Sequence, residues 1–541
     1  MSCGQAPSAA TPAGASDPAL RSLLRASQDL GPIGAGKPVS VTLQLVDARR
    51  SEREAALAAV YDPASPGYMK FLDLKTQASR FGPDSALSER VAAHLAAVGL
   101  QSSASSSLPL LTATGTARAM ELEFGVVIHD FVSRSGVRFY AETSAPAIPV
   151  EMQGEVQAIE PISSYPRFKS HYVPQGGATP SNLQNAYGEN PLKATGVDGS
   201  GETVAIYALG DGYNQSALDE FSDKFGLPRI TPTIVSGPKN AKEGSELQMD
   251  IEAVHAMAPK AAIHIFTNPP SDVGKFYDAI LADTAATVWS MSWGRCETEQ
   301  AASTRDVEKQ IYEKTAAAGI SVFFASGDSN AFDCLDEDYS APPSEKFVGV
   351  DFPSSLPMGV TSVGGTRISV REDGSYQDEV VWSEPLQTGG EGAGLSTLFD
   401  QPAWQRGPGV SQNKDNPAHK RMIPDVVADA SPQSGLAIKG GDGWSQGGGT
   451  SLSAPLWAGM TALINSYLVK KGLKRVGFLN PALYDLAAGK PAFPPFNDIT
   501  VGNNQVYSAG PGFDVATGLG SPNVWNLARD LETYQRNGGK P

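Results

Sequence analysis

Short apolar runs alternate with helical segments between residues 200 and 330 of the chain. The four runs are Thr203–Leu209, Ala261–Phe266, Thr287–Trp293 and Ile320–Ala325. A strand that is apolar on both faces must be covered on both sides, so the pattern predicts an α/β fold with a parallel sheet flanked by helices. In such sheets, ligands and reacting groups gather beyond the carboxyl ends of the strands. We therefore expect functional residues in the loops that follow these runs.

A shift in charge divides the 541 residues into two parts. Residues 1–175 hold 15 basic and 16 acidic side chains, whereas residues 176–541 hold 27 and 42. The stretch Pro174–Ser181 contains Pro, Gly and Ser and marks the boundary. The net charge of −16 argues against a nucleic-acid partner, because phosphate neutralisation needs an excess of Lys and Arg. No apolar stretch approaches the roughly 18 residues of a membrane-spanning helix, so no membrane span is expected.

The N-terminal part combines the periodicities of strands and helices. Strands are predicted at Val39–Val46, Leu108–Ala113 and Gly136–Ala141. Helices are predicted at Ser51–Val60 and Ser88–Val98. The pattern indicates a compact α+β domain, and no catalytic constellation lies within it.

The leader Met1–Ala19 is rich in Ser, Ala and Pro and has no apolar signal core. Two interpretations of Cys3 stay open. The sequence Met-Ser-Cys-Gly resembles the junction of a bacterial lipoprotein whose export signal has been trimmed. The alternative is a disordered N-terminus with an incidental thiol.

The other two cysteines, Cys296 and Cys334, each follow a predicted strand. The strands ending at Trp293 and near Ala325 are expected to be neighbours, so both loops leave the sheet at the same end. A disulfide and two buried free thiols are both compatible with this placement, because the Cα separation cannot be derived from sequence.

The segment Gly448–Pro455 reads Gly-Gly-Thr-Ser-Leu-Ser-Ala-Pro and precedes the apolar helix Leu456–Leu468. Glycines before a serine at a helix start let the backbone approach a substrate carbonyl, and helix N–H groups then face a developing oxyanion. The alternative is a Gly-rich loop in which Thr450 or Ser451 caps a helix. A nucleophilic serine also needs a base. None of the six histidines lies in a Gly-rich turn, so a histidine-based triad is poorly supported.

Carboxylates are better placed to serve as that base. Glu246 and Asp250 are four residues apart in a predicted helix, so both project from one face. Close approach raises the pKa of one member and creates a proton-sharing pair suited to acid–base work. The alternative is a solvated acidic face, although Leu247, Met249 and Ile251 interrupt it.

Further acidic residues follow the sheet and occupy the last loops. Asp328 follows the strand Ile320–Ala325 in the sequence Ser-Gly-Asp-Ser. A carboxyl group at the carboxyl end of a strand is placed for function, although an Asx-turn would also explain an Asp there. Asp498 and Asp514 lie in loops rich in Gly and Asn. Carboxylates with backbone carbonyls suit Ca²⁺, a hard ion that prefers oxygen ligands.

Together these segments resemble the sedolisin (serine-carboxyl peptidase) family, of which kumamolisin is a member. The Glu-x-x-x-Asp helix, the Ser-Gly-Asp loop and the Gly-Thr-Ser-x-x-x-Pro segment occur in family order and at family-like spacing. Four further segments match as well: Ser292–Gly294, Arg421–Val426, Asp498–Thr500 and Gly510–Asp514. The resemblance covers about residues 176–530, and Tyr61–Pro63 with Phe71–Pro83 resembles the family's N-terminal activation domain.

The resemblance implies an enzyme, a serine peptidase made as a zymogen and active in acid. It assigns Ser451 as the nucleophile, Glu246 as its general base and Asp250 as the residue that orients Glu246. Asp328 would be protonated and donate a hydrogen bond to the oxyanion, which a carboxyl group can do only below its pKa. Asn330 stands where the family usually has Gly, and Asn tolerates the left-handed conformation that this turn needs.

The resemblance also implies one Ca²⁺ ion per chain. Its ligands would be the carboxylates of Asp498 and Asp514 and the carbonyl oxygens of Ile499, Gly510 and Gly512.

The implied organisation is a disordered leader (1–19), an α+β activation pro-domain (20–165), a linker with the processing site (166–180) and a subtilisin-like peptidase domain (181–535). The pro-domain would inhibit its own enzyme, and proteins or peptides would be the substrates of an endopeptidase or tripeptidyl peptidase. The chain is expected to be a monomer, secreted or extracytoplasmic, and anchored at Cys3 if a signal was trimmed. Two alternatives are a catalytically silent peptide binder and a calcium-stabilised adhesion protein. The complete set of four site residues argues against the silent binder.

Overall fold

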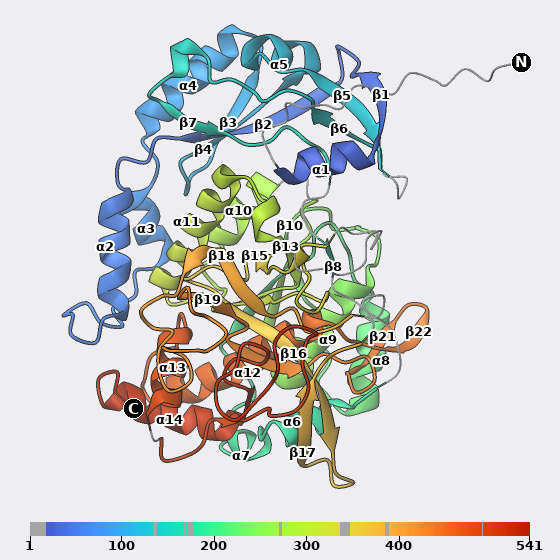
Figure 1. The fold of residues 1–541 in the computed structure, drawn as a ribbon, viewed down its shortest axis with the longest axis vertical. Helices are drawn as coiled ribbons and strands as arrows, with labels where there is room; N and C mark the ends of the chain where they lie inside the picture. Colours follow the sequence, from blue (N-terminus) through green and yellow to red (C-terminus); the bar gives the residue numbers. More distant parts are fainter. Residues whose placement is uncertain are drawn as a thin grey trace, which may run out of the picture. The chain divides into compact units, whose positions relative to one another are not determined.

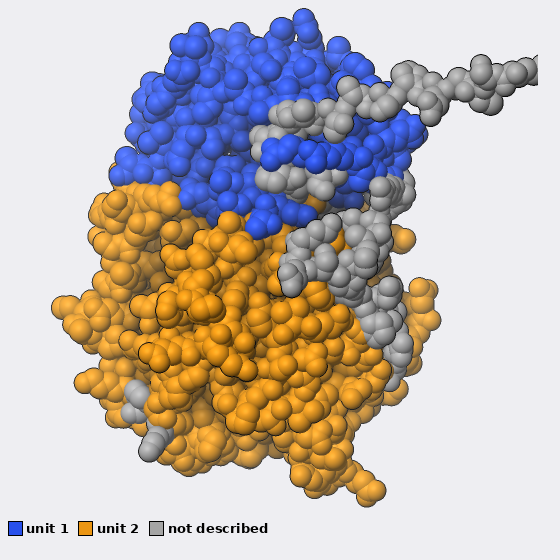
Figure 2. Space-filling view, in the orientation of Figure 1, with its two compact units in different colours: residues 1–48, 82–166, 298–307 blue, residues 49–81, 167–297, 308–541 orange. Residues whose placement is uncertain are grey.

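The computed structural model describes residues 18–133, 138–165, 169–170, 177–269, 273–335, 347–384, 389–489 and 491–540 (Figure 1). The chain forms two compact units (Figure 2). Unit 1 comprises residues 1–48, 82–166 and 298–307, and unit 2 comprises residues 49–81, 167–297 and 308–541. The predicted leader up to residue 17 and most of the predicted linker lie outside the described residues.

Unit 1 is built on a four-stranded antiparallel sheet and a smaller three-stranded one. The larger sheet has the order β3 (Gln101–Ala104), β4 (Leu110–Thr116), β2 (Pro38–Leu45) and β7 (Val156–Ile159). The smaller has the order β1 (Gln28–Pro32), β5 (Ile128–Val132) and β6 (Arg138–Glu142). Its helices are α1 (Pro18–Ala26), α4 (Ser85–Ala97) and α5 (Ala117–Phe124).

The predicted alternation of β2 is confirmed. Its residues Val39, Val41 and Leu43 are buried in one core with the apolar faces of α4 and α5. Burying every second residue of a strand covers one face of the sheet. Unit 1 therefore has the predicted α+β character.

The eight-stranded sheet of unit 2 confirms the predicted parallel α/β fold. Seven strands run in the order β10 (Thr233–Ser236), β11 (Ala262–Phe266), β9 (Thr203–Tyr207), β12 (Val288–Met291), β14 (Ser321–Ala325), β16 (Thr361–Val370) and β17 (Tyr376–Val381). The eighth, β20 (Val426–Asp429), pairs with β16. All of these pairings are parallel except that of β17 with β16.

Helix α12 (Thr450–Lys470) lies in the core of unit 2 and packs against α9 (Ser245–Met257) and strands β12, β14 and β16. A Cβ atom at Gly459 would lie 2.7 Å from the Cβ of Met257, so this glycine permits the close approach of the two helices. The helix begins at Thr450 rather than at the predicted Leu456. The serine of the Gly-Thr-Ser segment is therefore in its first turn.

The remaining helices of unit 2 and the helix shared by both units are α2 (Arg50–Tyr61), α3 (Leu74–Phe81), α6 (Pro180–Ala186), α7 (Asn190–Lys193), α8 (Gln215–Phe225), α10 (Val273–Ala282), α11 (Ala302–Ala318), α13 (Asn480–Ala488) and α14 (Val524–Arg536). The remaining strands are β8 (Lys169–Ser170), β13 (Trp293–Cys296), β15 (Asp351–Phe352), β18 (Gly394–Asp400), β19 (Lys420–Ile423), β21 (Ala437–Gly440), β22 (Gly443–Gln446), β23 (Phe496–Asn497) and β24 (Ser521–Pro522). Within the described part of the chain, none of the helices is long and apolar enough to cross a membrane.

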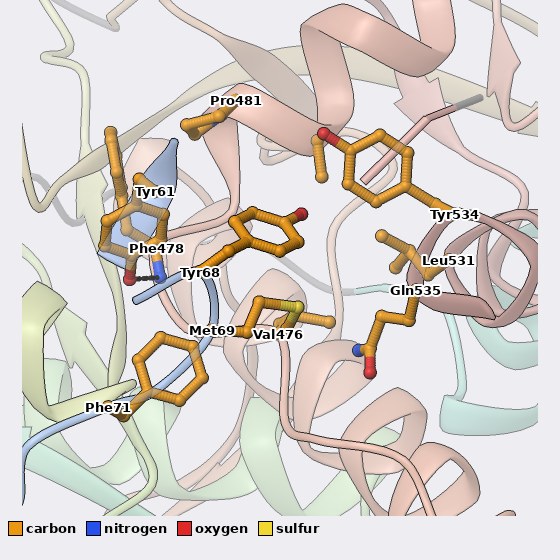
Figure 3. A pocket seen from close by; sticks show the side chains of 11 residues that line it. Tyr61, Tyr68, Met69, Phe71, Val476, Phe478, Pro481, Leu531, Tyr534 and Gln535 are labelled. Carbon is orange, nitrogen blue, oxygen red and sulfur yellow. Dashed lines mark hydrogen bonds between the residues drawn. The ribbon is translucent and has the colours of Figure 1, made fainter. Parts of the chain in front are cut away.

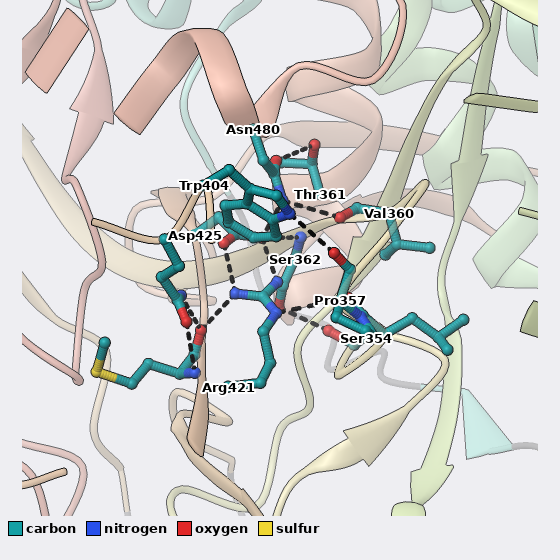
Figure 4. Close-up of polar contacts among 12 residues, drawn as sticks. Ser354, Pro357, Val360, Thr361, Ser362, Trp404, Arg421, Asp425 and Asn480 are labelled. Atoms are coloured by element: carbon teal, nitrogen blue, oxygen red, sulfur yellow. Dashed lines mark hydrogen bonds and ion pairs between the residues drawn. The ribbon is translucent and has the colours of Figure 1, made fainter. Parts of the chain in front are cut away.

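The Arg421–Val426 motif forms a buried ion pair that ties several elements of unit 2 together (Figure 4). The two guanidinium Nη atoms of Arg421 each donate to one carboxylate oxygen of Asp425 at 2.6 Å, and both side chains are fully buried. Asp425 also accepts from the amide N–H of Ser362, from Asn480 and from the hydroxyl of Tyr484. A buried pair needs these extra partners to offset its desolvation. The motif therefore has a structural role.

Candidate active site

Two glycines shape the turn that leads to Ser451. Gly449 has φ +84°, a conformation that favours glycine. A Cβ atom at Gly448 would lie 2.8 Å from Cγ of Pro432. Ser451 follows in the first turn of α12, where helix N–H groups lack intrahelical partners. This is the placement that the sequence predicted for an oxyanion-binding helix start.

The hydroxyl of Ser451 donates a hydrogen bond to the carbonyl oxygen of Ser292 at 3.3 Å. In return, Oγ of Ser292 lies 3.4 Å from the carbonyl oxygen of Ser451. That carbonyl lacks its usual helical donor, because Pro455, four residues later, has no N–H. The proline of the Gly-Thr-Ser-x-x-x-Pro segment thus leaves an acceptor for the Ser292 hydroxyl.

Ser292 also connects the serine to the carboxyl pair. Its Oγ donates to Oδ1 of Asp250 at 2.9 Å. Residues 287–293 were predicted as one strand, but β12 ends at Met291 and β13 begins at Trp293. Ser292 lies at this break, fully buried, at the carboxyl end of β12.

Glu246 and Asp250 lie one turn apart on α9, as predicted, and both are buried. Burial raises the pKa of Asp250 well above its usual value, and the negative charge of Glu246 raises it further. The hydrogen bond from Ser292 acts in the opposite direction, and Asp211 adds a smaller raising effect. Burial and the neighbouring carboxylate therefore both favour the protonated form of Asp250.

Asp328 lies beyond the carboxyl end of β14 and contacts the residue before Ser451. Its Oδ1 accepts from the amide N–H of Thr450 at 2.8 Å and from the Thr450 hydroxyl at 2.7 Å. The hydroxyl of Thr450 is also within 3.2 Å of the backbone N and O of Gly327. Thr450 thus holds the Asp328 loop beside the start of α12.

The turn after Asp328 has the conformation expected for its unusual Asn. Asn330 has φ +57°, and its amide N–H donates to the carbonyl oxygen of Gly390 at 3.0 Å. Cys334 forms a disulfide with Cys296, with a Cα–Cα separation of 4.8 Å, so the pairing that the sequence left open is present. The disulfide joins the last residue of β13 to the segment after Asp328.

Four of the described histidines have side-chain partners other than Ser451. His255 contacts the hydroxyl of Ser222, and burial lowers its pKa to about 4. His264 contacts Asp283, His94 contacts Glu123 and His129 contacts Asp29. None of the hydrogen bonds found among these described side chains joins a histidine to Ser451, in agreement with the sequence analysis.

Asp498 and Asp514 converge on the loop around Gly510 and Gly512. Gly512 N–H donates to Oδ2 of Asp498, and Gly510 N–H donates to Oδ2 of Asp514, both at 2.9 Å. Burial raises the pKa of Asp514 to about 6. No cluster of three or more His, Cys, Asp or Glu suited to a metal occurs among the described residues. A cation here would therefore need carbonyl oxygens as well, and a donor set made only of oxygens fits Ca²⁺.

Sequence reasoning treated Thr450 only as a possible helix cap and Ser292 only as part of a matching segment, and it predicted no contact of either with the site. Ser292 lies inside an apolar run, where a single serine gives no pattern, and Thr450 has the ordinary appearance of a helix cap. The missing N–H of Pro455 is the one sequence signal that points to a donor for the Ser451 carbonyl.

A buried serine at a helix start, the carboxyl group of Asp250 joined to it through Ser292, and a mostly parallel α/β sheet are features of a serine peptidase of the subtilase type. Residues 232–476 match the subtilase family, and residues 25–165 match the pro-kumamolisin activation domain. The chain is 31% identical to kumamolisin of Bacillus sp. (strain MN-32) over 447 residues, which cover 76% of each chain. It belongs to the sedolisin family of serine-carboxyl peptidases, to which kumamolisin belongs.

Other members are similar over more of the length. Sedolisin of Pseudomonas sp. (strain 101) is 26% identical over 93% of this chain and 89% of its own. Tripeptidyl-peptidase 1 of Canis lupus familiaris is 27% identical over 93% of both chains. The solved structure of Pseudomonas sedolisin, complexed with pseudo-iodotyrostatin, has a TM-score of 0.57 and 27% identity and covers 68% of this chain and 99% of its own.

Proposed function

We propose that this enzyme cleaves peptide bonds in acid through an acyl-enzyme on Ser451, with carboxyl groups in place of a histidine base. The observation that carries the proposal is the chain of contacts from Ser451 through Ser292 to Asp250. These contacts connect the buried hydroxyl of Ser451, through Ser292, to the buried carboxyl group of Asp250.

The reaction would begin with attack of Ser451 Oγ on the carbonyl carbon of the scissile bond, while its proton moves to Glu246. Glu246 then returns the proton to the leaving amine as the C–N bond breaks. Water then hydrolyses the ester: it delivers one proton to Glu246 and its hydroxyl to the acyl carbon, and Glu246 returns the proton to Ser451 Oγ as the ester C–O bond breaks. Asp250, fixed by Ser292, would orient Glu246 and share its proton.

Asp328 would stabilise the oxyanion. Thr450 holds its Oδ1 with two hydrogen bonds, which fixes the carboxyl group beside the helix start. When protonated, the carboxyl group can donate to a charge that develops in the transition state, in a site prepared before the reaction.

The buried carboxyl groups of unit 2 support an acidic working range. Burial raises the pKa of Glu189, Glu252 and Asp429 to about 8 each. Burial also raises the pKa of Asp250 and Glu391 well above their usual values. An acid with a raised pKa binds more protons in the folded than in the unfolded state, so its contribution to stability falls as pH rises.

The melting temperature of the processed enzyme is therefore expected to fall between pH 5 and pH 8. The window runs from the ordinary carboxyl pKa near 4 to the raised values near 8, and we expect a decrease of at least about 5 °C. Calorimetry at several pH values, with calcium held constant, measures this decrease. Glu252→Gln is the matched variant, because removing one raised carboxyl group should make the melting temperature less dependent on pH. A melting temperature that rises steadily to pH 8 would contradict this account.

We further propose one Ca²⁺ ion held by the carboxylates of Asp498 and Asp514 and the carbonyl oxygens of Ile499, Gly510 and Gly512. The ion would fix the C-terminal loops and take no part in the bond-breaking steps. Both carboxylates already accept from the backbone of the same loop.

Chelation is expected to destabilise the processed enzyme, and added Ca²⁺ to restore it. An ion at about 100 times its Kd stabilises the folded state by about 3 kcal/mol. Because the pKa of Asp514 is about 6, the effect should be larger at pH 6.5 than at pH 4, where the protonated carboxyl binds Ca²⁺ poorly. Asp514→Asn should abolish the calcium effect on the melting temperature, whereas Asp415→Asn in an exposed loop should preserve it. Equal melting temperatures with and without chelator at pH 6.5 would reject the site.

The proposed organisation keeps residues 1–19 as the leader, 20–165 as the pro-domain, 166–180 as the linker to be cut and 181–535 as the peptidase domain. The activation-domain match supports the pro-domain as an inhibitor in the same chain. The Cys296–Cys334 disulfide supports an oxidising, extracytoplasmic location. One group of relatives carries the name tripeptidyl-peptidase 1, and protein or peptide substrates of an endopeptidase or a tripeptidyl peptidase are proposed here.

Self-processing in acid tests the proposed function. Moving the purified full chain from pH 7 to pH 4 is expected to produce a cut within residues 166–180, identified by N-terminal sequencing of the larger product. An intact chain after prolonged incubation at pH 3–5, with no cleavage of added protein substrate, would favour a silent peptide binder instead.

A further inference from the structure

Residues 49–81 lie within the stretch that matches the activation domain, yet they pack in unit 2 with the peptidase sequence. We call this stretch the anchor segment. It consists of α2, a loop with Tyr68 and Phe71, and α3. Its contacts in unit 2 show what holds it there.

Tyr61 makes two hydrogen bonds to the peptidase backbone. Its hydroxyl donates to the carbonyl oxygen of Ala316 at 2.7 Å. It also accepts from the amide N–H of Phe478 at 2.7 Å (Figure 3). The ring meets that of Phe478 edge to face, with 5.7 Å between centroids. Burial raises the pKa of Tyr61 well above its usual value, as expected for a hydroxyl removed from water.

The end of α11 receives further donors from the anchor segment. The amide N–H of Leu72 donates to the carbonyl oxygen of Ala317 at 2.8 Å, and Nε2 of Gln77 donates to that of Lys314 at 2.9 Å. The last carbonyls of a helix have no intrahelical partner. The N–H of Leu72 therefore supplies a donor to one of these last carbonyls, that of Ala317.

Two glycines of the peptidase sequence make room for Phe71. A Cβ atom at Gly319 would lie 2.6 Å from the ring, and one at Gly477 would lie 3.0 Å from it. Both glycines also have positive φ, so the chain bends away at each of these points. Leu57 of α2 joins Ala316, Ala317 and Phe478 in one apolar cluster.

A small cavity continues this interface. Tyr68 and Met69 from the anchor segment and Leu531, Tyr534 and Gln535 from α14 line it (Figure 3). Tyr534 donates to Asp485 at 3.0 Å and so holds its ring at the cavity wall.

We propose that the anchor segment is the element by which the N-terminal piece stays bound to the peptidase domain after the linker is cut. Its receptor is a socket formed by the end of α11, Gly319, Gly477 and Phe478. The inference rests on the proposed function only in taking residues 166–180 as the place of the cut. The processed enzyme would carry an apolar socket that selects this segment of its own chain.

The test separates docking from catalysis. In the full chain, Ser451→Ala blocks self-cleavage, and the recognition sequence of an external protease replaces residues 171–176. After cleavage at pH 7.5, gel filtration and the release of a fluorescently labelled N-terminal piece measure the dissociation rate. Tyr61→Phe removes only the hydroxyl, Phe71→Ala removes the ring, and Lys70→Ala is the control because its side chain is exposed next to Phe71.

The nicked parent protein is expected to elute as one complex. Tyr61→Phe and Phe71→Ala should each raise the dissociation rate by at least about tenfold. Tyr61→Phe removes the hydroxyl that accepts from the N–H of Phe478, and Phe71→Ala removes an apolar contact. Lys70→Ala should leave the rate unchanged. Should Phe71→Ala fail to fold, Tyr61→Phe decides. Immediate release of the piece from the parent, or equal rates for the parent and Tyr61→Phe, would overturn the proposal whether or not the chain is an active peptidase.

Discussion

Replacing Ser451 with alanine is expected to abolish both self-processing and cleavage of added substrate, by at least about 10⁴-fold. The variant loses the proposed nucleophile and only one hydrogen bond, the one to the Ser292 carbonyl. Its melting temperature should therefore stay close to that of the parent. Initial rates at pH 4 on a fluorogenic peptide, with calorimetry on the same sample, measure both effects.

Ser453 provides the matched control for this experiment. It lies two residues further along α12, is equally buried, and its hydroxyl donates to the carbonyl oxygens of Ala428 and Asp429 at 3.0 Å each. Ser453→Ala should lower stability while retaining activity. The reverse result, an active Ser451→Ala and an inactive Ser453→Ala, would move the nucleophile to Ser453.

Glu246→Gln is expected to reduce kcat by about 10²–10⁴-fold, because glutamine cannot accept the serine proton. The substitution conserves shape and removes one of two neighbouring carboxyl charges, so the fold should be retained. Asp328→Asn keeps a donor but changes its strength and the contacts with Thr450, and should cost about 10²–10³-fold. Steady-state kinetics at several pH values measure both.

A third carboxyl group of the same helix, that of Glu252, serves as a comparison for Glu246. Glu252 is also buried on α9 but accepts from Gln248 and from the amide N–H of Lys439 rather than joining the Ser292 contacts. Glu252→Gln should leave kcat within a few fold of the parent. Near-normal rates for both Glu246→Gln and Asp328→Asn would reject the carboxyl mechanism.

The sheet could be predicted from the sequence because a buried parallel strand needs apolar side chains on both faces. β9, β11 and β14 lie within the predicted runs for this reason. The helix that carries Glu246 and Asp250 could be placed as well, since its end at Ala258-Pro259 is a local signal.

Contacts between distant parts of the chain could not be predicted in the same way. Ser292 meets Asp250 and Ser451 only after β12, α9 and α12 are packed together, and its own neighbours in sequence give no sign of it. The membership of residues 49–81 in unit 2 was likewise hidden, because their helical pattern is that of any amphipathic segment. The need for glycine at positions 319 and 477 becomes clear only from the structure, in which the ring of Phe71 packs against both.

The dependence of kcat/KM on pH tests the central claim most directly, namely that carboxyl groups and not histidine activate Ser451. The processed enzyme should be most active in acid and lose activity towards neutral pH, because the proposed oxyanion stabilisation requires a protonated carboxyl group. Measurement from pH 2.5 to pH 8 with calcium present, on one peptide substrate, gives the full curve. A profile that rises with a midpoint near 6.5 to a plateau above pH 7 is the signature of a histidine base and would contradict the account.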